Sequence, residues 1–430
     1  MSITVTTKLT ERYLLEPIDL VSLSKTCKTL FPYCRSDIFW QRHVQDHVPG
    51  GQITSPYPCS SFRELFIAHD PHWFLPKYKI WFSDFWLTGK IIIAHFDPRR
   101  GCIEGFRLVA ERAPPIFETW EADEKVLVHF FNPKTRLHMD QPVLKLDAIS
   151  PKPKIVGSEE MLAASRFSRE VPMHTSDHRP GIFSTFLLTR PVEEHPSMEL
   201  WPPRIIPSRH RVRNSSQEGF AGSNHKPHKR SEISDLSFRI RRWMEIGDGI
   251  HLGEEVYTYA TLDPKLYTPT EDKPWRGIWV GDYSGHGCEF LLMHQPDSED
   301  PFDVSTVIQA EDETPDEFKL RKTQERIYRG SLYAIKLTGD PNVPRGEDTF
   351  RVEDLSKTIR VATEDIFKGA RIVESKGHVA SNMFKDDKYI ESQLILISPD
   401  KLAQYWVAFG HISFYERIDI DQFITQDQTR

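Results

Sequence analysis

The sequence predicts an α+β protein, in which a short N-terminal helical module precedes a large antiparallel β-barrel-like domain with a disordered insertion. Three observations lead to this prediction. Apolar residues near the N-terminus recur at three- and four-residue steps, the spacing of a helix face. From Trp73 onward, short runs of β-branched and aromatic residues alternate with turns that contain Gly or Pro. Between two such stretches, residues 151–235 carry little strand signal and several basic clusters.

These patterns divide the chain into five segments. A helical module over 10–48 is followed by a linker and short helix over 49–72. The β domain occupies 73–150 and resumes over 236–425, with the insertion 151–235 between its two parts. No repeat of the fixed period that marks propellers or solenoids is visible. A closed or nearly closed barrel that uses strands from both halves is therefore the most economical arrangement.

The helical module begins with a proline-led helix. Pro17 stands at a position where helices commonly start. We expect this helix to end at Phe31-Pro32, and its apolar face is formed by Leu20, Leu23, Cys27 and Leu30. Ser36 is the expected N-cap of a further helix that contains Trp40. Three such short helices bury little surface alone, so a module of this kind usually needs a partner.

Composition excludes several classes of protein. The formal net charge is −7, which argues against general nucleic-acid binding. No apolar run reaches the length of a transmembrane helix, and residues 1–15 do not resemble a signal peptide. The five cysteines are widely spaced and form no CxxC pair, which disfavours both a disulfide framework and a zinc site. We therefore expect a cytoplasmic or nuclear protein without a cofactor.

The sequence also predicts the local structure of two regions in the second part of the β domain. Residues 399–406 read as a short helix near the end of the chain, and the acidic stretch 311–317 reads as a solvated loop. Within the insertion, the apolar run 181–188 is compatible with a strand or a docked segment, and its basic clusters with a solvated loop or a nuclear-localisation signal.

Two glycine-rich segments are the candidate binding elements. Gly281–Glu289 lies between two strand-like runs, and its glycines permit a tight turn that exposes backbone N–H groups beside His286. Lys336–Gly346 leads from a strand into a loop stiffened by two prolines. In that loop, Asp340 and Asn342 can either cap neighbouring N–H groups or contact a ligand.

The motifs of catalysis are missing. The sequence has neither a Gly-x-Ser-x-Gly elbow nor a His-Glu-x-x-His helix, and the 18 histidines are scattered. We expect no catalytic residues and no metal site. An enzyme that uses His286 with Asp340 or Glu289 is an alternative from another class.

These same residues carry a family resemblance. Residues 15–30, followed by Asp37-Ile-Phe-Trp40, resemble the later two thirds of an F-box, although the part before Leu15 is shorter than the family's first helix. Segments 281–289 and 336–346, in that order and each beside strands, resemble the C-terminal domain of the F-box only protein 31 family, which is shared in part with the plant EXECUTER proteins. The flanking chain from about Trp73 to Phe423 is similar to fungal members of this group.

The resemblance implies a non-catalytic, substrate-binding subunit of an SCF-type ubiquitin ligase. The helical module would bind a Skp-type adaptor, and through it a cullin scaffold, with Leu14, Leu15, Pro17, Leu20, Leu23 and Trp40. The β domain would bind protein substrates, including C-terminal ends that carry an amide, with His286, Glu289, Lys336, Thr338, Asp340 and Asn342. An alternative from another class is a β-barrel that binds a small molecule in a deep apolar cavity.

Overall fold

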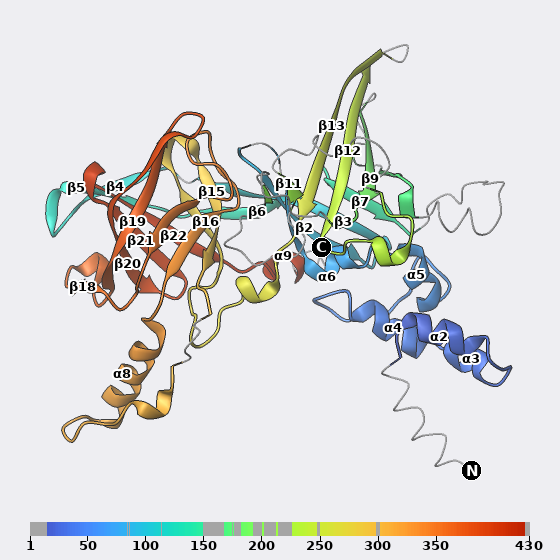
Figure 1. The fold of residues 1–430 in the computed structure, drawn as a ribbon, viewed down its shortest axis with the longest axis horizontal. Coiled ribbons are helices and arrows are strands. Elements are labelled where there is room, and N and C mark those ends of the chain that lie inside the picture. Colours follow the sequence, from blue (N-terminus) through green and yellow to red (C-terminus); the bar gives the residue numbers. More distant parts are fainter. Residues whose placement is uncertain are drawn as a thin grey trace.

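The computed structural model describes residues 15–425, except for 84, 86, 113, 149–166, 174, 176–181, 192–199, 202–211, 214–225, 247–249 and 298–301. It consists of N-terminal helices, a nine-stranded sheet that curves into a half-barrel, and a closed eight-stranded barrel beside it (Figure 1). The predicted α+β class is confirmed. The strands nevertheless form two main sheets instead of one barrel that spans both halves. Most of the predicted insertion lies outside the described residues.

Among the described residues, five helices precede the first strand: α2 (Pro17–Ser24), α3 (Leu30–Cys34), α4 (Asp37–Gln45), α5 (Phe62–His69) and α6 (Phe74–Tyr78). Helix α2 begins at Pro17, as expected, but ends at Ser24 rather than at Phe31-Pro32. The hydroxyl of Ser24 donates to the Val21 carbonyl and that of Thr26 to the Leu23 carbonyl, each at 2.7 Å. Such local bonds compete with helix continuation, so Cys27 lies outside α2 and is exposed.

The helices share one core with the half-barrel. Leu20 and Trp40 pack in the same buried cluster as Phe66 and Trp73, and this cluster extends onto the sheet through residues such as Trp81. Trp40 also donates from Nε1 to the Cys34 carbonyl at 2.8 Å. The helical module is therefore attached to the half-barrel by a continuous apolar contact. None of the described helices is long and apolar enough to cross a membrane.

The half-barrel takes strands from both sides of the predicted insertion 151–235 and also from within it. Its order is β6-β3-β2-β1-β13-β12-β9-β8, with β7 paired to β3. Its strands are β1 (Ile80–Ser83), β2 (Lys90–Asp97), β3 (Cys102–Glu111), β6 (Lys134–His138), β7 (Leu144–Asp147), β8 (Val171–Met173), β9 (Ile182–Leu188), β12 (Ser237–Ile246) and β13 (Ile250–Ala260). Strand β9 confirms that the apolar run 181–188 contains a strand. Two further short strands, β10 (Leu200–Trp201) and β11 (Val212–Arg213), pair with each other.

The barrel is an antiparallel meander. Its strands, in sheet order, are β14 (Gly277–Asp282), β15 (Cys288–His294), β16 (Leu332–Lys336), β17 (Asp348–Val352), β19 (Arg371–Ser381), β20 (Lys385–Ser398), β21 (Lys401–Trp406) and β22 (His411–Ile418). Pairing of β14 with β22 closes it. The short strand β18 (Thr358–Val361) pairs with β19 outside this path. The prediction of a helix over 399–406 is wrong, because residues 401–406 form β21 and pair with both β20 and β22.

A second core joins the two sheets. One face of the half-barrel contributes side chains such as Phe82 and Phe106, and the outer wall of the barrel contributes Leu292 and Phe414. Helix α9 (Gln422–Thr425) adds its apolar residues to the same contact, and Figure 1 places it between the two sheets. The Lys79 ammonium also lies 2.6 Å from Asp421 Oδ1. The half-barrel thus covers part of the barrel's outer wall.

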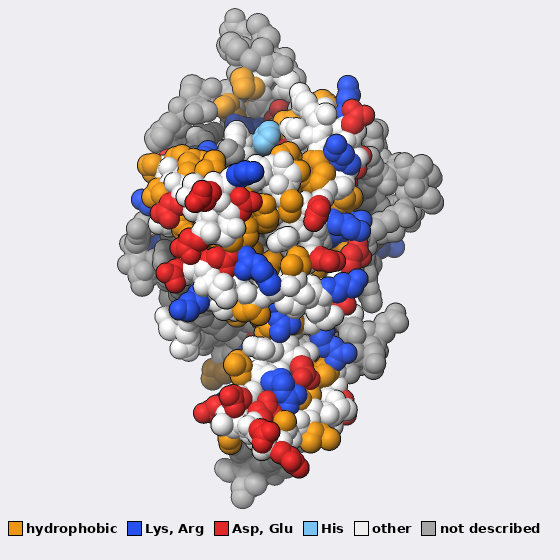
Figure 2. Space-filling view, turned by 90° about the vertical axis from the view of Figure 1, so that its left-hand side faces the viewer, with side chains coloured by type: hydrophobic (Ala, Val, Ile, Leu, Met, Phe, Trp, Pro, Cys, Tyr) orange, Lys and Arg blue, Asp and Glu red, His pale blue; other side chains and the backbone are white. Residues whose placement is uncertain are grey.

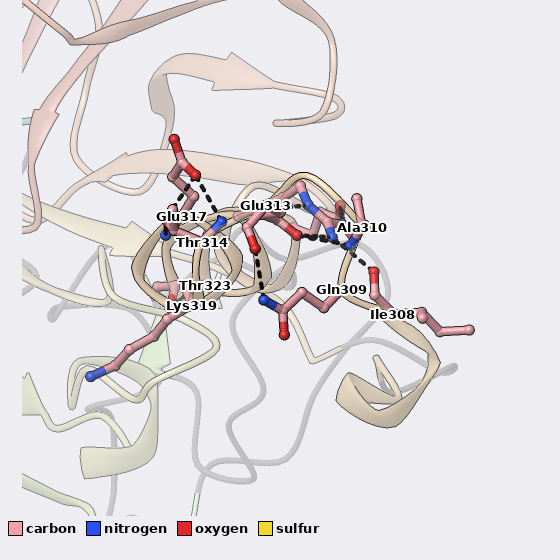
Figure 3. A network of polar contacts seen from close by, with 10 residues as sticks. Ile308, Gln309, Ala310, Glu313, Thr314, Glu317, Lys319 and Thr323 are labelled. Atoms are coloured by element: carbon pink, nitrogen blue, oxygen red, sulfur yellow. Dashed lines mark hydrogen bonds and ion pairs between the residues drawn. The ribbon is translucent and has the colours of Figure 1, made fainter.

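Helix α8 (Pro315–Ile327) projects from the barrel (Figure 1) and buries none of its side chains. Its N-cap, Thr314, exchanges hydrogen bonds with Glu317, a capping box that Figure 3 shows at close range. The prediction that residues 311–317 form only a loop is therefore wrong in its second half. The sequence Thr-Pro-Asp-Glu at 314–317 is itself a helix-start signal.

Candidate binding site at the barrel mouth

The order of the strands brings four connections to one end of the barrel. In a meander, every second connection lies at the same end. The turns over 283–287, 337–347, 382–384 and 407–410 therefore form one rim, here called the mouth. The first two contain the glycine-rich segments singled out from the sequence. Their neighbourhood in space depends on barrel closure.

The mouth encloses a hollow of about 350 Å³. Every one of the four connections or its flanking strand ends contributes to the lining. The lining residues are Asp282, Tyr283, His286, Lys336, Asp340, Asn342, Val343, Thr349, His378, Val379, Ala380, Trp406, Phe409, His411 and Ser413. The hollow is blind, because side chains from all eight strands, including Trp279, Phe350 and Tyr415, pack against one another in the barrel interior.

A buried ion cluster lies at the floor of the mouth. Lys336 Nζ lies 2.6 Å from Asp340 Oδ2 and 2.8 Å from Glu289 Oε2. The ammonium also stands 4.5 Å from the centre of the Tyr283 ring, a cation–π contact. All three charged side chains are almost fully buried. The lysine therefore depends on these neighbours for the solvation that water would otherwise provide.

The cluster is neutral overall near pH 7. Burial, together with the nearby Asp340 carboxylate, raises the pKa of Glu289 to about 8. Burial also acts to raise the pKa of Asp340, but the Lys336 ammonium and several hydrogen bonds outweigh it and lower this pKa to about 2. One ammonium, one carboxylate and one carboxylic acid therefore share the site. Among the described lining residues, Lys336 is the only Lys or Arg, and its charge is already compensated.

Asp340 organises the loop in which it stands. Its Oδ1 accepts from the backbone N–H of Asn342 at 2.6 Å and of Val343 at 2.9 Å. Of the two roles expected from the sequence, this is the turn-capping one. The Asn342 side chain in turn donates to the Ala380 carbonyl at 2.9 Å and so joins this loop to the neighbouring hairpin. At Gly339, a Cβ would lie only 2.3 Å from the Arg345 backbone nitrogen, so the loop requires glycine there.

An aromatic wall faces this polar floor. Trp406 lies against Gly377, where a Cβ would meet the indole at 2.4 Å, so the glycine makes room for the ring. Trp406 Nε1 donates to Ser413 Oγ at 3.3 Å, and Phe409 extends the wall outward with 63% of its surface exposed. The mouth therefore combines hydrogen-bonding groups at its floor with apolar surface at its side, as small-ligand and peptide pockets do.

The histidines of the mouth differ in their surroundings. His286 is exposed on the first turn, whereas His378 is buried and stacks on Tyr389 with ring centres 4.4 Å apart. The ring nitrogens of His378 face the Asp348 carbonyl at 2.9 Å and Asp387 Oδ2 at 3.1 Å. Glu347, Asp348 and His378 have ligand atoms close enough for a metal ion. Because protein groups already occupy both histidine nitrogens, we assign no metal to this group.

The structure brings four of the six predicted substrate-binding residues to the surface of the mouth. They are His286, Lys336, Asp340 and Asn342. Glu289 lies in the ion cluster at the floor, and Thr338 accepts from the Phe290 N–H at 2.9 Å beside it. Sequence reasoning missed His378, Trp406 and Phe409, and did not single out Tyr283 within the segment 281–289. For the other three residues, the local sign was the Phe409-Gly410 pair, since Gly410 has the positive φ of 58° that a tight turn needs.

The residues predicted to bind an adaptor have mixed exposure. Leu14 lies outside the described residues, and Leu15, Pro17 and Leu23 are partly exposed. Leu20 and Trp40 are 1% exposed and belong to the core of the chain. Other large apolar side chains of α2, α3 and α4 face outward instead: Ile18, Phe31, Tyr33 and Ile38, with exposures between 44% and 68%. In this conformation Leu20 and Trp40 are not accessible from solvent, whereas these four side chains are.

Comparison with known proteins adds one match. Residues 259–422 match the family model described as the Cyclin D1 binding domain, which is found in F-box only protein 31. Both glycine-rich segments lie within the matched range. No F-box was detected in the chain, and no curated protein matched it. The matched range includes every strand of the closed barrel, so the barrel with its mouth is the part of the chain that is similar to a Cyclin D1 binding domain.

Proposed function

We propose that this chain is the non-catalytic substrate-binding subunit of an SCF-type ubiquitin ligase, and that the barrel mouth binds one end of a target protein. The match of the whole barrel to a Cyclin D1 binding domain carries the first part of this proposal, because it implies a protein ligand. Cyclin D1 is accordingly the first target to test.

The form of the mouth favours a chain end over a continuous chain. A blind hollow of about 350 Å³ accepts a terminus or a single projecting side chain, but a polypeptide cannot pass through it. A free C-terminal carboxylate needs an uncompensated cation, and Lys336 is already paired with Asp340. A C-terminal amide is neutral and offers both a donor and acceptors. The neutral floor therefore favours an amide-bearing end.

A matched pair of peptides tests this function. Peptides of identical sequence ending in a carboxamide or a carboxylate are titrated against the full chain, and the carboxamide should bind at least about tenfold more tightly. Trp406→Ala should weaken carboxamide binding, while Ile359→Ala, an exposed residue on β18 outside the mouth, should not. Equal affinity of the two peptides for the parent chain would contradict the amide preference, and unchanged binding by Trp406→Ala would contradict the mouth as the site.

The exposed apolar residues on α2, α3 and α4 support the adaptor part of the proposal. A patch of large apolar side chains on a small helical unit marks a protein contact surface. Ile18 and Ile38 are 68% and 63% exposed. They form the proposed adaptor surface together with the partly exposed Leu15, Pro17 and Leu23.

Charge substitutions separate this surface from the core. Ile18→Glu and Ile38→Glu should abolish co-purification of the chain with a Skp-type adaptor and cullin, and should leave the melting temperature unchanged. Ile308→Glu is the matched control, because Ile308 is 81% exposed and lies near α8. Adaptor binding that survives the first two changes would exclude the ligase role assigned to the helices.

The structure offers less support for the alternatives. A small-molecule-binding barrel requires a deep apolar cavity, but the described barrel interior is filled by residues such as Trp279 and Phe350. An enzyme that uses His286 with Asp340 requires a carboxylate free to orient the imidazole. Asp340 instead accepts from two backbone N–H groups and from Lys336.

A further inference from the structure

The barrel wall does not close over its whole height. Strand β22 pairs with β14 only from Tyr415 to Ile418. Closer to the mouth, His411 to Ser413 of β22 pair instead with β5 (Asp123–Phe130), in parallel register. Strand β5 forms a hairpin with β4 (Ile116–Trp120). At the mouth, the barrel sheet therefore continues outward onto the β4–β5 hairpin.

The residue pairing between β22, β5 and β4 shows which face of the β4–β5 hairpin continues the surface of the mouth. His411 and Ser413 line the mouth, and their partners on β5 are Leu127 and His129. Because paired residues point to the same side of a sheet, Leu127 and His129 lie on the mouth side. One strand further, Thr119 pairs with Leu127 and Phe117 with His129. We call the surface formed by Phe117, Thr119, Leu127 and the rim residue Phe409 the shelf.

The shelf presents apolar surface to solvent. Phe117 is 48% exposed, Leu127 is 46% exposed and the rim residue Phe409 is 63% exposed. The Leu127 N–H donates to the carbonyl of Gly410, the residue after Phe409, at 2.9 Å. The Phe117 ring stacks on His129 with centres 4.7 Å apart, and His129 Nε2 lies 3.6 Å from Asp282 Oδ2 in the mouth. Figure 2, which faces this side of the molecule, shows hydrophobic side chains gathered in its upper half among charged ones. The ring is thus held in place with one side free.

The opposite face of the hairpin explains why the shelf stays open. Val126 and Val128 are buried in the core between the two sheets. The hairpin is therefore anchored through one face and presents the other. On the anchored side, Ile116 pairs with Phe130 and is 60% exposed at the end of the strand.

We propose that the shelf binds the segment of the target polypeptide that precedes the residues held in the mouth, and selects apolar side chains in that segment. This proposal rests on the proposed function, and its support is the continuous surface from mouth to shelf. Neighbouring strands lie about 4.8 Å apart, so β4 is about 10 Å from β22. An extended chain covers this distance in about three residues. The apolar positions that the shelf selects therefore lie about three to five residues before the bound end of the target polypeptide.

The exposed charges at the turn of the β4–β5 hairpin indicate which charge the target segment carries. Glu121, Asp123 and Glu124 are exposed beyond the shelf together with Lys125, so the acidic side chains outnumber the basic one. A target segment that crosses the shelf away from the mouth passes close to this acidic turn. Basic residues upstream of the apolar positions would therefore strengthen binding at low salt.

An array of synthetic dodecapeptides tests the shelf. The residues near the C-terminal end are varied, and each sequence is presented with a carboxamide and with a carboxylate end. The full chain, Phe117→Ser, Leu127→Ser and the matched control Ile116→Ser are compared. We expect the parent and Ile116→Ser to favour apolar residues about three to five positions before the end. The two shelf variants should lose this preference and bind the apolar peptides about tenfold more weakly.

The possible results distinguish the shelf from the mouth. If both shelf variants keep the upstream apolar preference, the shelf proposal is wrong while end recognition stands. If Ile116→Ser loses the preference as well, the effect is a general loss of the hairpin and the shelf is again excluded. If the parent recognises no peptide end, the function assigned to the mouth fails, and the shelf proposal fails with it. Thermal melting of each variant excludes unfolding as the cause.

Discussion

Lys336 is held in the barrel by two carboxyl groups that differ in protonation. It lies 2.6 Å from Asp340 and 2.8 Å from Glu289, and all three side chains are buried. A buried cation with this arrangement serves to fix geometry, since the loss of water around the charges offsets much of their attraction. Here the geometry that is fixed is the loop over 336–346, because Asp340 also caps the backbone of Asn342 and Val343.

Removal of the Lys336 ammonium should therefore lower the free energy of unfolding. Lys336→Met leaves the Asp340 carboxylate buried without its cation, and we expect a loss of about 3–5 kcal/mol in the free energy of unfolding. Glu289→Gln should cost much less at pH 7, because Glu289 with its pKa of about 8 is already protonated there. Urea denaturation of the two variants checks this order. Equal losses would show that Glu289 is ionised in the folded chain.

The pH dependence of stability provides a separate check. The pKa of Glu289 rises from an ordinary value of 4.5 to about 8 on folding, so between these values the folded chain holds a proton that the unfolded chain releases. The contribution of the protonated Glu289 to the free energy of unfolding is complete below pH 4.5 and is lost as the pH rises through 8. Relative to Glu289→Gln, the parent should lose stability over this window by up to about 1.4 kcal/mol per pH unit. Parallel pH profiles would contradict the raised pKa.

At the scale of single elements, some were predictable and others were not. The start of α2 followed from Pro17, and the turns at 281–289 and 336–346 followed from their glycines and prolines. Strand β21 was mistaken for a helix because Leu402, Tyr405 and Trp406 fit helical spacing equally well. Helix α8 was missed because it buries no side chain and therefore shows no apolar face. The mouth itself depends on barrel closure, so no local pattern could place Trp406 and His378 there.

Helix α8 should depend on its cap more than on packing. Thr314 accepts from the Glu317 N–H at 3.3 Å and donates to Glu317 Oε2 at 2.7 Å (Figure 3). Thr314→Ala should cost about 1 kcal/mol of helix stability and speed amide exchange over 315–327 without a change in the melting temperature. Thr323→Ala, within the same helix, is the control and should slow exchange slightly. A lower melting temperature for Thr314→Ala would mean that α8 supports the barrel.

At the scale of the whole molecule, the half-barrel and the barrel share one core. Phe82 of the half-barrel is fully buried in the same cluster as Phe414 of the barrel. The helices are attached to the half-barrel by the other core, which contains Leu20 and Trp40. The proposed adaptor surface and the mouth are therefore parts of one continuous framework. A subunit that presents a bound target to a ligase requires such a connection between its two ends.

A core substitution should reveal this coupling. Phe82→Ala removes a buried ring and should cost about 3–5 kcal/mol. If the two sheets unfold together, slow amide exchange in β14 and β15 should accelerate as much as that in β1 and β2. Exchange that accelerates only in the half-barrel would show that the two sheets unfold independently.

Photo-crosslinking tests the central claim, that the mouth holds the end of a target chain, most directly. A peptide that binds the full chain is made with a diazirine on its last residue, irradiated in the complex and mapped by mass spectrometry. We predict crosslinks to the mouth turns over 283–287, 337–347 and 407–410, and loss of these crosslinks in Trp406→Ala. Crosslinks that fall instead on the groove between β17 and β20, around Arg351 and Ile390, or on the half-barrel would contradict the account.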